Sequence, residues 1–245
     1  MNLIVDVGNT RAKAVVMSAE RVVESFVSES VTRPWIEAIV AKYSDIGRAI
    51  VSSTRGDAQQ YCSLLSEFVD VVICFNPAVT PIPLGNEYHT PQTLGADRLA
   101  AAVGAAAMYP GCELMIVDFG TAITIDFVEG GAFRGGNISP GVTTRFRSLA
   151  DYTACLPFCS ATDEVLEYGR TTKEAIEQGV MRGVEHEIRG YCDDFSEKNG
   201  EKRIIFTGGD AKYFAMRIKN AIFADCEPVI FGLNTILNYN AEKQE

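Results

Sequence analysis

The chain has 245 residues, 47% of them hydrophobic, and a formal net charge of -10. This size suffices for one large soluble domain or for two domains of about 120 residues, each with its own core. The negative charge provides no basic surface for nucleic acid or for an anionic membrane, so a few local cations or a metal would have to hold any anionic substrate.

The first third of the sequence predicts three strands followed by alternating helices and strands. Val-rich runs at 11–18 and 21–28 form a hairpin after a first strand at 3–5, and Thr32 caps a helix with Pro34 in its first turn. The order that follows is a strand at 49–51, a helix at 57–68 and a strand at 71–75. This order predicts an α/β unit with a mixed sheet.

A polar turn, Asp6-Val7-Gly8-Asn9-Thr10, directly follows the first strand. Glycine lets backbone N–H groups approach an anion, and a nearby carboxylate can hold the cation that neutralises it. The alternative is an ordinary hairpin turn. A second turn of the same layout, Asp118-Phe119-Gly120-Thr121-Ala122, favours phosphate binding.

Residues 76–93 carry four prolines and almost no periodicity, which predicts a loop of unusual length and hence of functional importance. The loop leads to Gly95-Ala96-Asp97-Arg98, which opens an Ala-rich helix that ends at about Tyr109. Its small side chains suit close packing at a contact between domains or subunits. Asp97 and Arg98 could alternatively form an ion pair in the first helical turn.

The second half repeats the order of the first, with strands at 113–118, 123–128 and 132–135. A glycine-rich stretch at 135–141 leads into a helix at 142–152. Thr171 and Glu174 match a capping box before a long helix at 172–197. A strand at 203–206, a turn Thr207-Gly208-Gly209-Asp210, helices at 211–219 and 228–239, and a polar tail at 240–245 complete the chain.

The cysteines and the N-terminus predict a cytoplasmic protein. Seven Cys, an odd number, lie scattered in apolar segments, as Cys74, Cys112 and Cys226 do, which favours reduced thiols. The apolar run before Asp6 is only Leu3-Ile4-Val5, too short for a signal peptide, and no run is long enough to span a membrane. The lone pair Cys155 and Cys159 lacks the second half of a zinc site.

The glycine-bearing turns match neither a P-loop nor a dinucleotide-binding fingerprint. Taken together and in order, however, the turns at 6–10, 95–98, 118–122, 136–141 and 207–210 resemble those of type III pantothenate kinases, over residues 6 to about 215. This family belongs to the actin-like superfamily of acetate and sugar kinases. The resemblance implies transfer of the γ-phosphoryl group of ATP to pantothenate, which gives 4'-phosphopantothenate, the first step of coenzyme A biosynthesis.

The resemblance also implies roles for the residues of the nucleotide site. Asp6 would hold Mg2+ on the ATP phosphates, and Thr121 would contact these phosphates. Asp118 would bind a monovalent cation, K+ or NH4+. The residues that would line the ATP phosphate loop are Asp6, Val7, Gly8, Asn9, Thr10, Arg11, Ala12 and Lys13.

For the acceptor, the resemblance implies that Asp97 is the catalytic base and that Arg98 binds pantothenate, together with Gly95 and Ala96. A carboxylate with an ordinary pKa is a weak base for an alcohol, so its main contribution would be to orient the hydroxyl. Two further substrate contacts would come from Tyr88 and Thr172, with Thr171 as an alternative to Thr172. The family resemblance places Thr172 on a partner subunit of a homodimer.

The expected fold is therefore α/β, with two ribonuclease H-like (actin-like) halves, 1–110 and 111–245, mixed sheets flanked by helices, and the nucleotide in the cleft between them. Two other functions stay open: a non-catalytic accessory or regulatory homologue, and an actin-like kinase for another small hydroxy acid. The presence of Asp6, Asp97, Asp118 and Thr121 argues against a non-catalytic protein, because such a chain has no chemical need for all four.

Overall fold

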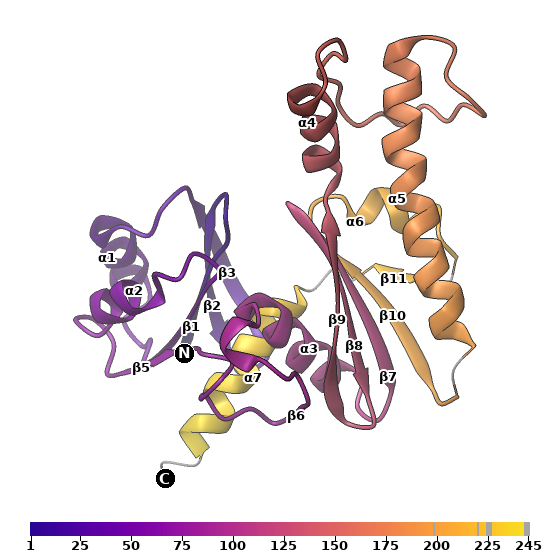
Figure 1. The fold of residues 1–245 in the computed structure, drawn as a ribbon. Coiled ribbons are helices and arrows are strands. Elements are labelled where there is room, and N and C mark those ends of the chain that lie inside the picture. The colour runs from indigo at the N-terminus through magenta and orange to yellow at the C-terminus, as the bar shows by residue number, and fades with distance from the viewer. Residues whose placement is uncertain (198, 220, 224–226, 243–245) are drawn as a thin grey trace. The chain divides into compact units, whose positions relative to one another are not determined.

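A computed structural model describes residues 1–197, 199–219, 221–223 and 227–242, with only the backbone of 222 and 223 (Figure 1). The chain divides into two compact units. The first comprises Met1–Gly111, Val128–Gly135 and the C-terminal segment described at 227–242, and the second comprises Cys112–Phe127 and the described part of 136–223. This division differs from the expected halves 1–110 and 111–245, because the chain returns to the first unit twice.

The first unit contains a five-stranded mixed sheet in the order β3-β2-β1-β4-β5. β1 pairs antiparallel with β2 and parallel with β4, β2 pairs antiparallel with β3, and β4 pairs parallel with β5. The mixed sheet predicted for this part of the chain is therefore confirmed. The strands are β1 (Asn2–Val7), β2 (Ala12–Ser18), β3 (Arg21–Ser28), β4 (Arg48–Ser53) and β5 (Val71–Cys74).

Helices α1 (Arg33–Lys42) and α2 (Ala58–Leu65) contribute to the buried core of this sheet through apolar side chains such as Ile36, Ile39 and Leu65. The predicted loop at 76–93 holds a short strand, β6 (Gly85–Asn86), and a single 3-10 turn, η1 (Pro91–Thr93). Both elements are too short for a periodic sequence pattern, which explains why the sequence does not predict them.

The Ala-rich helix α3 (Ala96–Met108) lies beside the C-terminal helix α7 (Pro228–Glu242) (Figure 1). A Cβ atom on Gly104 would come within 2.0 Å of the Pro228 carbonyl oxygen, and one on Gly232 within 1.8 Å of the Ala100 carbonyl oxygen. The small residues of α3 thus serve a backbone-close contact inside one unit, whereas the sequence predicted a contact between domains or subunits. α7 continues past the predicted end at Tyr239, and residues 243–245 of the expected tail lie outside the described residues.

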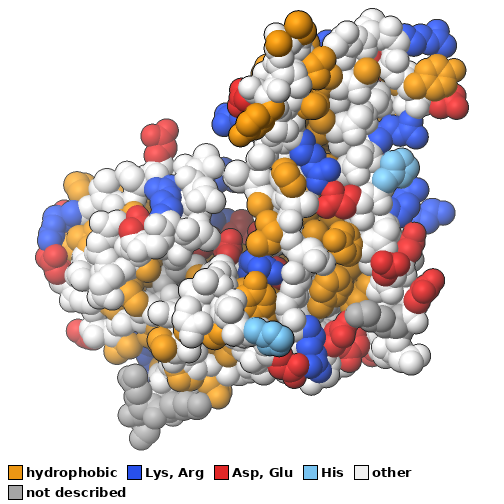
Figure 2. All heavy atoms as spheres, viewed as in Figure 1, with side chains coloured by type: hydrophobic (Ala, Val, Ile, Leu, Met, Phe, Trp, Pro, Cys, Tyr) orange, Lys and Arg blue, Asp and Glu red, His pale blue; other side chains and the backbone are white. Residues whose placement is uncertain are grey.

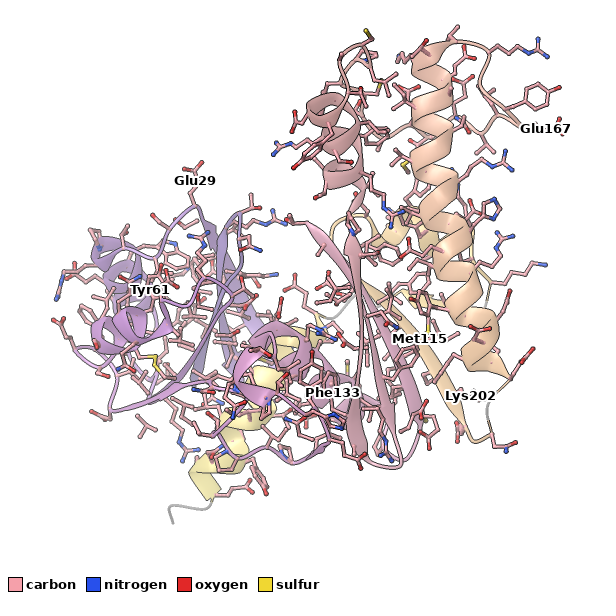
Figure 3. The ribbon with its side chains drawn as sticks, in the orientation of Figure 1. Glu29, Tyr61, Met115, Phe133, Glu167 and Lys202 are labelled. Atoms are coloured by element: carbon pink, nitrogen blue, oxygen red, sulfur yellow. A yellow bond between two sulfur atoms is a disulfide. The ribbon has the colours of Figure 1, made fainter. Side chains whose placement is uncertain are left out.

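The second sheet has the order β11-β10-β7-β8-β9-β6. Met115 and Phe133, both labelled in Figure 3, are fully buried on β7 and β9. β9 extends through the glycine-rich stretch that was expected to be a loop, because Gly136 lets it approach β8: a Cβ there would lie 2.0 Å from the Ile125 carbonyl oxygen. The strands are β7 (Glu113–Phe119), β8 (Ala122–Glu129), β9 (Ala132–Pro140), β10 (Lys202–Thr207) and β11 (Ala221–Phe223).

Three helices accompany this sheet in the second unit: α4 (Val142–Tyr152), α5 (Thr172–Ser196) and α6 (Ala211–Ala215). α5 supplies a buried apolar face that includes Val184 and Ile188. The capping box predicted for α5 is present, since Thr171 Oγ1 accepts a hydrogen bond from the Glu174 N–H at 3.2 Å. α6 is shorter than the predicted helix at 211–219. Among the described helices, none combines the length and apolarity needed to cross a membrane.

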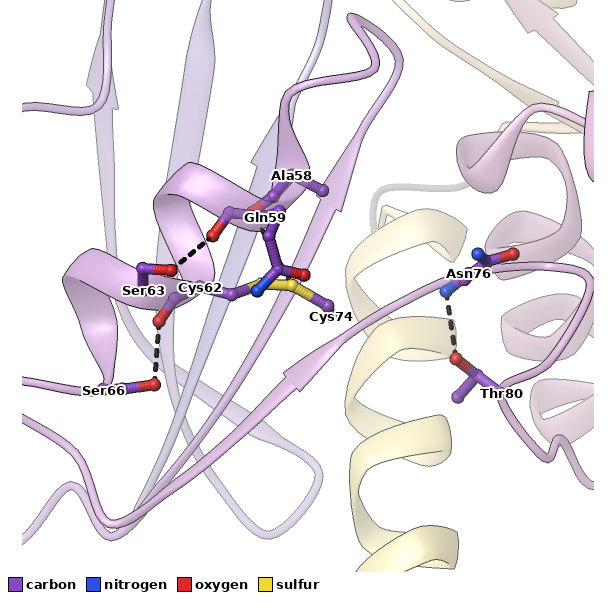
Figure 4. The surroundings of a disulfide bond; sticks show 8 residues. All are labelled: Ala58, Gln59, Cys62, Ser63, Ser66, Cys74, Asn76 and Thr80. Carbon is purple, nitrogen blue, oxygen red and sulfur yellow. Dashed lines mark hydrogen bonds between the residues drawn. A yellow bond between two sulfur atoms is a disulfide. The ribbon is translucent and has the colours of Figure 1, made fainter.

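The structure corrects the prediction that the thiols are all reduced, because Cys62 and Cys74 form a disulfide (Figure 4). α2 carries Cys62 next to the end of β5, so that the two Cα atoms lie 5.9 Å apart, a separation typical of disulfides. Cys112, Cys155, Cys159 and Cys192 are free thiols. Cys226 lies outside the described residues.

Candidate active site

The predicted phosphate loop is the turn that joins β1 to β2. Asp6, the second-to-last residue of β1, pairs with Lys13 on the neighbouring strand β2. Residues 8–11 form the turn itself. The Gly8 N–H donates to the Arg11 carbonyl at 3.1 Å, which closes the turn. Asn9 and Thr10 are exposed at its tip, whereas Val7 and Ala12 are buried in the sheet.

Lys13 ends this predicted ATP-binding segment with a cationic side chain. Its ammonium group forms an ion pair with Glu227, which lies directly before α7 in the same unit. Both side chains are partly exposed. The sequence offers no signal for this pairing, because 214 residues separate the two partners.

The acceptor motif lies at the start of α3. Gly95 is the N-cap residue, and Asp97 and Arg98 lie in the first turn. The Arg98 N–H donates to Asp97 Oδ1 at 2.8 Å. Burial raises the pKa of the Asp97 carboxyl above its ordinary value, although the hydrogen bond from the Arg98 backbone and the Arg98 charge oppose the shift. Asp97 is therefore a better base than the ordinary carboxylate that the sequence led us to expect.

Tyr88 lies next to Arg98, so the structure places two of the predicted substrate contacts side by side. The guanidinium carbon of Arg98 is 5.8 Å from the centre of the Tyr88 ring. The ring also lies near Phe133, at a centroid distance of 6.0 Å, and near Gly135, where a Cβ would approach Tyr88 Cδ2 to 3.2 Å. Gly135 has a φ of 103°, which favours glycine. Arg98 is itself buried, so a planar cation and a phenol ring are held together beside Asp97.

In the second unit, three of the predicted motifs meet at the ends of β7 and β10. Asp118 pairs with Thr207 in the parallel register of these strands. Gly208, with a φ of 94°, comes so close that a Cβ on it would lie 2.3 Å from Asp118 Oδ1. The sequence predicted each motif separately, and the parallel pairing of β7 with β10 brings two of them together.

The third motif, the glycine-rich stretch at 136–141, contacts the turn that begins at Asp118 through the backbone of Thr121. The Thr121 carbonyl oxygen accepts hydrogen bonds from the Gly141 N–H at 3.0 Å and from Thr144 Oγ1 at 2.7 Å. A Cβ on Gly141 would lie 2.1 Å from the Gly120 carbonyl oxygen, so only glycine allows α4 to begin this close to the turn. The Thr121 residue itself is exposed.

Thr171 and Thr172, the two alternative substrate contacts, have different surroundings. Thr171 Oγ1 is occupied by capping α5, while Glu174 accepts a hydrogen bond from the Arg170 N–H at 2.7 Å. Thr172 lines an open hollow of about 570 Å³ between α4 and α5, together with Arg145 and Leu149. Thr172 therefore faces the hollow, whereas the Thr171 hydroxyl caps α5.

The residues present fit a magnesium ion that arrives with ATP. Mg2+ prefers oxygen ligands and is usually bound by one or two carboxylates together with substrate phosphates. The half-buried Asp6 carboxylate beside the phosphate loop supplies such a ligand. Within the described residues, no three His, Cys, Asp or Glu side chains form a group that could hold a metal ion.

Sequence reasoning missed Arg55, which follows β4 and contacts the phosphate loop. Arg55 Nε donates to the Gly8 carbonyl at 2.8 Å, and Nη2 donates to the Asn9 carbonyl at 3.1 Å. The available signal was the polar run at 52–57, which directly follows the strand predicted at 49–51. Parallel neighbouring strands place their carboxyl ends at the same edge of a sheet, so this run lies beside the turn after β1.

Comparisons with known proteins agree with the family resemblance of the sequence. The family model of type III pantothenate kinases matches residues 2–194. The chain is 39% identical to the type III pantothenate kinase of Bacteroides fragilis, with 98% of each chain covered, and 37% identical to that of Flavobacterium johnsoniae, with 99% of each covered.

Solved structures show the same fold at lower identity. A conserved Campylobacter jejuni protein assigned to the Baf family of transcriptional activators superposes with a TM-score of 0.66 at 22% identity, covering 98% of this chain and 99% of that one. MreB5 of Spiroplasma citri, bound to ADP, superposes with a TM-score of 0.52 at 13% identity, covering 99% and 97%. The actin-like fold is thus confirmed, and the chain belongs to the type III pantothenate kinase family.

Proposed function

We propose that this chain phosphorylates pantothenate with the residues placed above. The family match over the whole chain supports the reaction: the enzyme is a kinase that transfers a phosphoryl group from ATP to pantothenate and so begins coenzyme A biosynthesis. The observation that carries the assignment of roles is the cluster of the buried Arg98 with Asp97, at the start of α3, and Tyr88, in the loop before it.

Asp97 orients the primary hydroxyl of pantothenate and accepts its proton. Phosphoryl transfer depends on alignment and charge stabilisation, so proton transfer can come late, when the hydroxyl has become acidic. The raised pKa of Asp97 makes that late transfer more favourable. Arg98, held against the Tyr88 ring, supplies the fixed cation for an anionic acceptor.

The nucleotide is held by the turn at 6–13, with Asp6 as the Mg2+ ligand and Thr121 as a further phosphate contact. Bound Mg2+ neutralises charge on the phosphates. The Asp118 carboxylate, close to Gly208, provides oxygen ligands for a monovalent cation, K+ or NH4+.

A direct assay tests the reaction and the base together. Incubation with Mg-ATP, KCl and pantothenate is expected to yield 4'-phosphopantothenate, detected by mass spectrometry. Asp97→Asn is expected to lower kcat by about 100-fold or more, within the range of general-base contributions. Product formation at the background rate in the wild type, or undiminished turnover in Asp97→Asn, would refute these assignments.

The monovalent cation requires its own comparison. Replacing KCl by NaCl at equal ionic strength is expected to lower kcat in the wild type, because Na+ is smaller than the K+ or NH4+ proposed to bind at Asp118. In Asp118→Asn the rates in the two salts are expected to converge. Equal rates in both salts for the wild type would argue against a cation site at Asp118.

We further propose a homodimer in which Thr172 reaches the substrate of the partner copy. The end of the second unit that carries Thr172 exposes large apolar side chains, and hydrophobic surface is visible along α4 in Figure 2. Contiguous exposed apolar surface of this kind typically marks a protein contact. The exposed side chains are Tyr152, Phe158, Val165 and Tyr168.

A further inference from the structure

Arg55 is an exposed cation whose side chain contacts the backbone of the predicted phosphate loop. β4 runs parallel to β1, with Ser53 paired to Val7, so the segment after β4 emerges beside the turn after β1. Arg55 Nε is 2.8 Å from the Gly8 oxygen, and Nη2 is 3.1 Å from the Asn9 oxygen. Both donors therefore bind consecutive carbonyl groups of the same turn.

These two bonds set the direction of two N–H groups. In a planar trans peptide, the C=O of one residue and the N–H of the next point in opposite directions. Arg55 binds the carbonyls of Gly8 and Asn9, so the N–H groups of Asn9 and Thr10 point away from the guanidinium. The Gly8 N–H is already used inside the turn, by the Arg11 carbonyl. The two N–H groups whose direction Arg55 sets are therefore those of Asn9 and Thr10.

The segment that carries Arg55 is fixed at both sides. The Thr54 N–H donates to the Val7 carbonyl at 3.0 Å. On the other side, Asp57 accepts hydrogen bonds from Ser53 Oγ at 2.5 Å and from the hydroxyl of Tyr61, labelled on α2 in Figure 3, at 2.7 Å. Arg55 thus extends from an anchored segment and can transmit its position to the turn.

We propose that Arg55 is a positioning residue for ATP, which holds the turn at 8–10 so that the N–H groups of Asn9 and Thr10 face the phosphates. This inference rests on the proposed assignment of residues 6–13 to ATP. Arginine suits the role because its rigid, planar fork binds two acceptors at once, whereas a lysine ammonium is a point charge on a flexible stem.

Three substitutions test the proposal. Arg55→Ala is expected to raise both the KM for ATP and the Kd for Mg-ADP by about tenfold. This factor corresponds to the loss of one charge-assisted hydrogen bond between an N–H group of the turn and a phosphate. The kcat and the KM for pantothenate are expected to change less than about twofold. Arg55→Lys is expected to lie between wild type and Arg55→Ala. Arg33→Ala, which removes an exposed arginine paired with Glu67 on the same unit, serves as the matched control with wild-type constants.

Several outcomes would overturn the proposal. An unchanged Kd for Mg-ADP in Arg55→Ala would remove Arg55 from the nucleotide site. A lower kcat with an unchanged KM for ATP would place it at the reacting phosphoryl group instead. Equal losses in both KM values, together with a lower melting temperature, would indicate a merely structural role. If Arg55→Ala does not fold, Arg55→Lys and Arg55→Gln give the same comparison.

The binding measurement separates this inference from the proposed reaction. Mg-ADP titration needs no pantothenate, so a wild-type protein that binds Mg-ADP but forms no phosphopantothenate would refute the acceptor while Arg55 is still tested. A wild-type protein that binds no nucleotide would overturn both.

Discussion

At the scale of single residues, Asp97 combines two requirements that oppose each other. Catalysis needs its carboxylate form, whereas burial favours the neutral form and raises its pKa. A group whose pKa is raised in the folded state stabilises the fold below its unfolded pKa, and this contribution is lost as pH rises through the folded pKa. The ionised Asp97 therefore lowers the stability of the enzyme at the pH where it works.

This conflict predicts opposite effects of Asp97→Asn on activity and stability. The amide is isosteric with the protonated acid, so at pH 7 the variant is expected to melt at a higher temperature than the wild type, and the difference is expected to disappear as pH falls below the ordinary pKa of Asp. In the wild type, kcat is expected to fall on acidification at a higher pH than an unperturbed carboxyl would give. Thermal melts at about pH 7 and about pH 3, on either side of the ordinary pKa of Asp, with a pH profile of kcat, test both statements. A less stable Asp97→Asn at pH 7 would contradict them.

Adjacent threonines provide a second test at this scale, with the same substitution at each. Thr171→Ala removes the cap of α5 and is expected to cost about 1 kcal/mol, which lowers Tm by about 2 to 4 °C in a protein of this size. Thr172→Ala is expected to leave Tm unchanged and to raise the KM for pantothenate. The reverse assignment, with the KM effect at Thr171, would show that the hollow between α4 and α5 is not part of the substrate site.

At the scale of elements, the contact between α3 and α7 determines where Asp97 lies, because Asp97 is in the first turn of α3. The two backbones approach so closely at Gly104 that a methyl group would overlap the Pro228 carbonyl. α7 therefore acts as the support on which the catalytic helix is placed, although the two helices are far apart in sequence.

Glycine-to-alanine substitutions in two helices test this support. Gly104→Ala is expected to destabilise the fold by about 1 to 3 kcal/mol through overpacking and to lower kcat by moving α3. Gly190→Ala on α5 meets nothing within 4 Å, so it is expected to stabilise the protein by about 0.5 to 1 kcal/mol through the lower entropy of the unfolded chain. Chemical denaturation measures both. Equal effects of the two substitutions would mean that α3 and α7 do not form the contact described.

The helices and strands that sequence reasoning predicted are those with a clear period or a clear end signal, such as β2, β3 and the capped helix α5. It failed where a strand is short or glycine-rich, as for β6, β11 and the extension of β9, because such segments lack a periodic pattern. The polar turns were found from their own residues. The partners Arg55 and Glu227, and the contact of Gly208 with Asp118, were not found, because they depend on strand pairing and on the return of the C-terminal helix, which local sequence does not reveal.

At the scale of the whole molecule, Thr172 could contact pantothenate bound to its own chain or pantothenate bound to a second copy. Asp97 belongs to the first unit and Thr172 to the second. The exposed apolar residues around Thr172, among them Tyr152 and Tyr168, favour a contact with a second copy. In a symmetric dimer each copy would then supply Asp97 to one site and Thr172 to the other.

Mixing two defective variants decides the matter. Asp97→Asn and Thr172→Ala are each expected to be poor enzymes at low pantothenate concentration, and each homodimer carries two copies of the same defect. After the two variants are unfolded together and refolded, half of the dimers are expected to be mixed, and each mixed dimer has one site with both residues intact. Activity should therefore recover to about one quarter of the wild-type value.

The separately refolded variants, combined afterwards, are the control. If Thr172 serves the site of its own chain, no mixed dimer contains an intact site, and the mixture will be no more active than the sum of its parts. Light scattering coupled to gel filtration shows in the same samples whether dimers form, and a monomer with full activity would rule out the shared site.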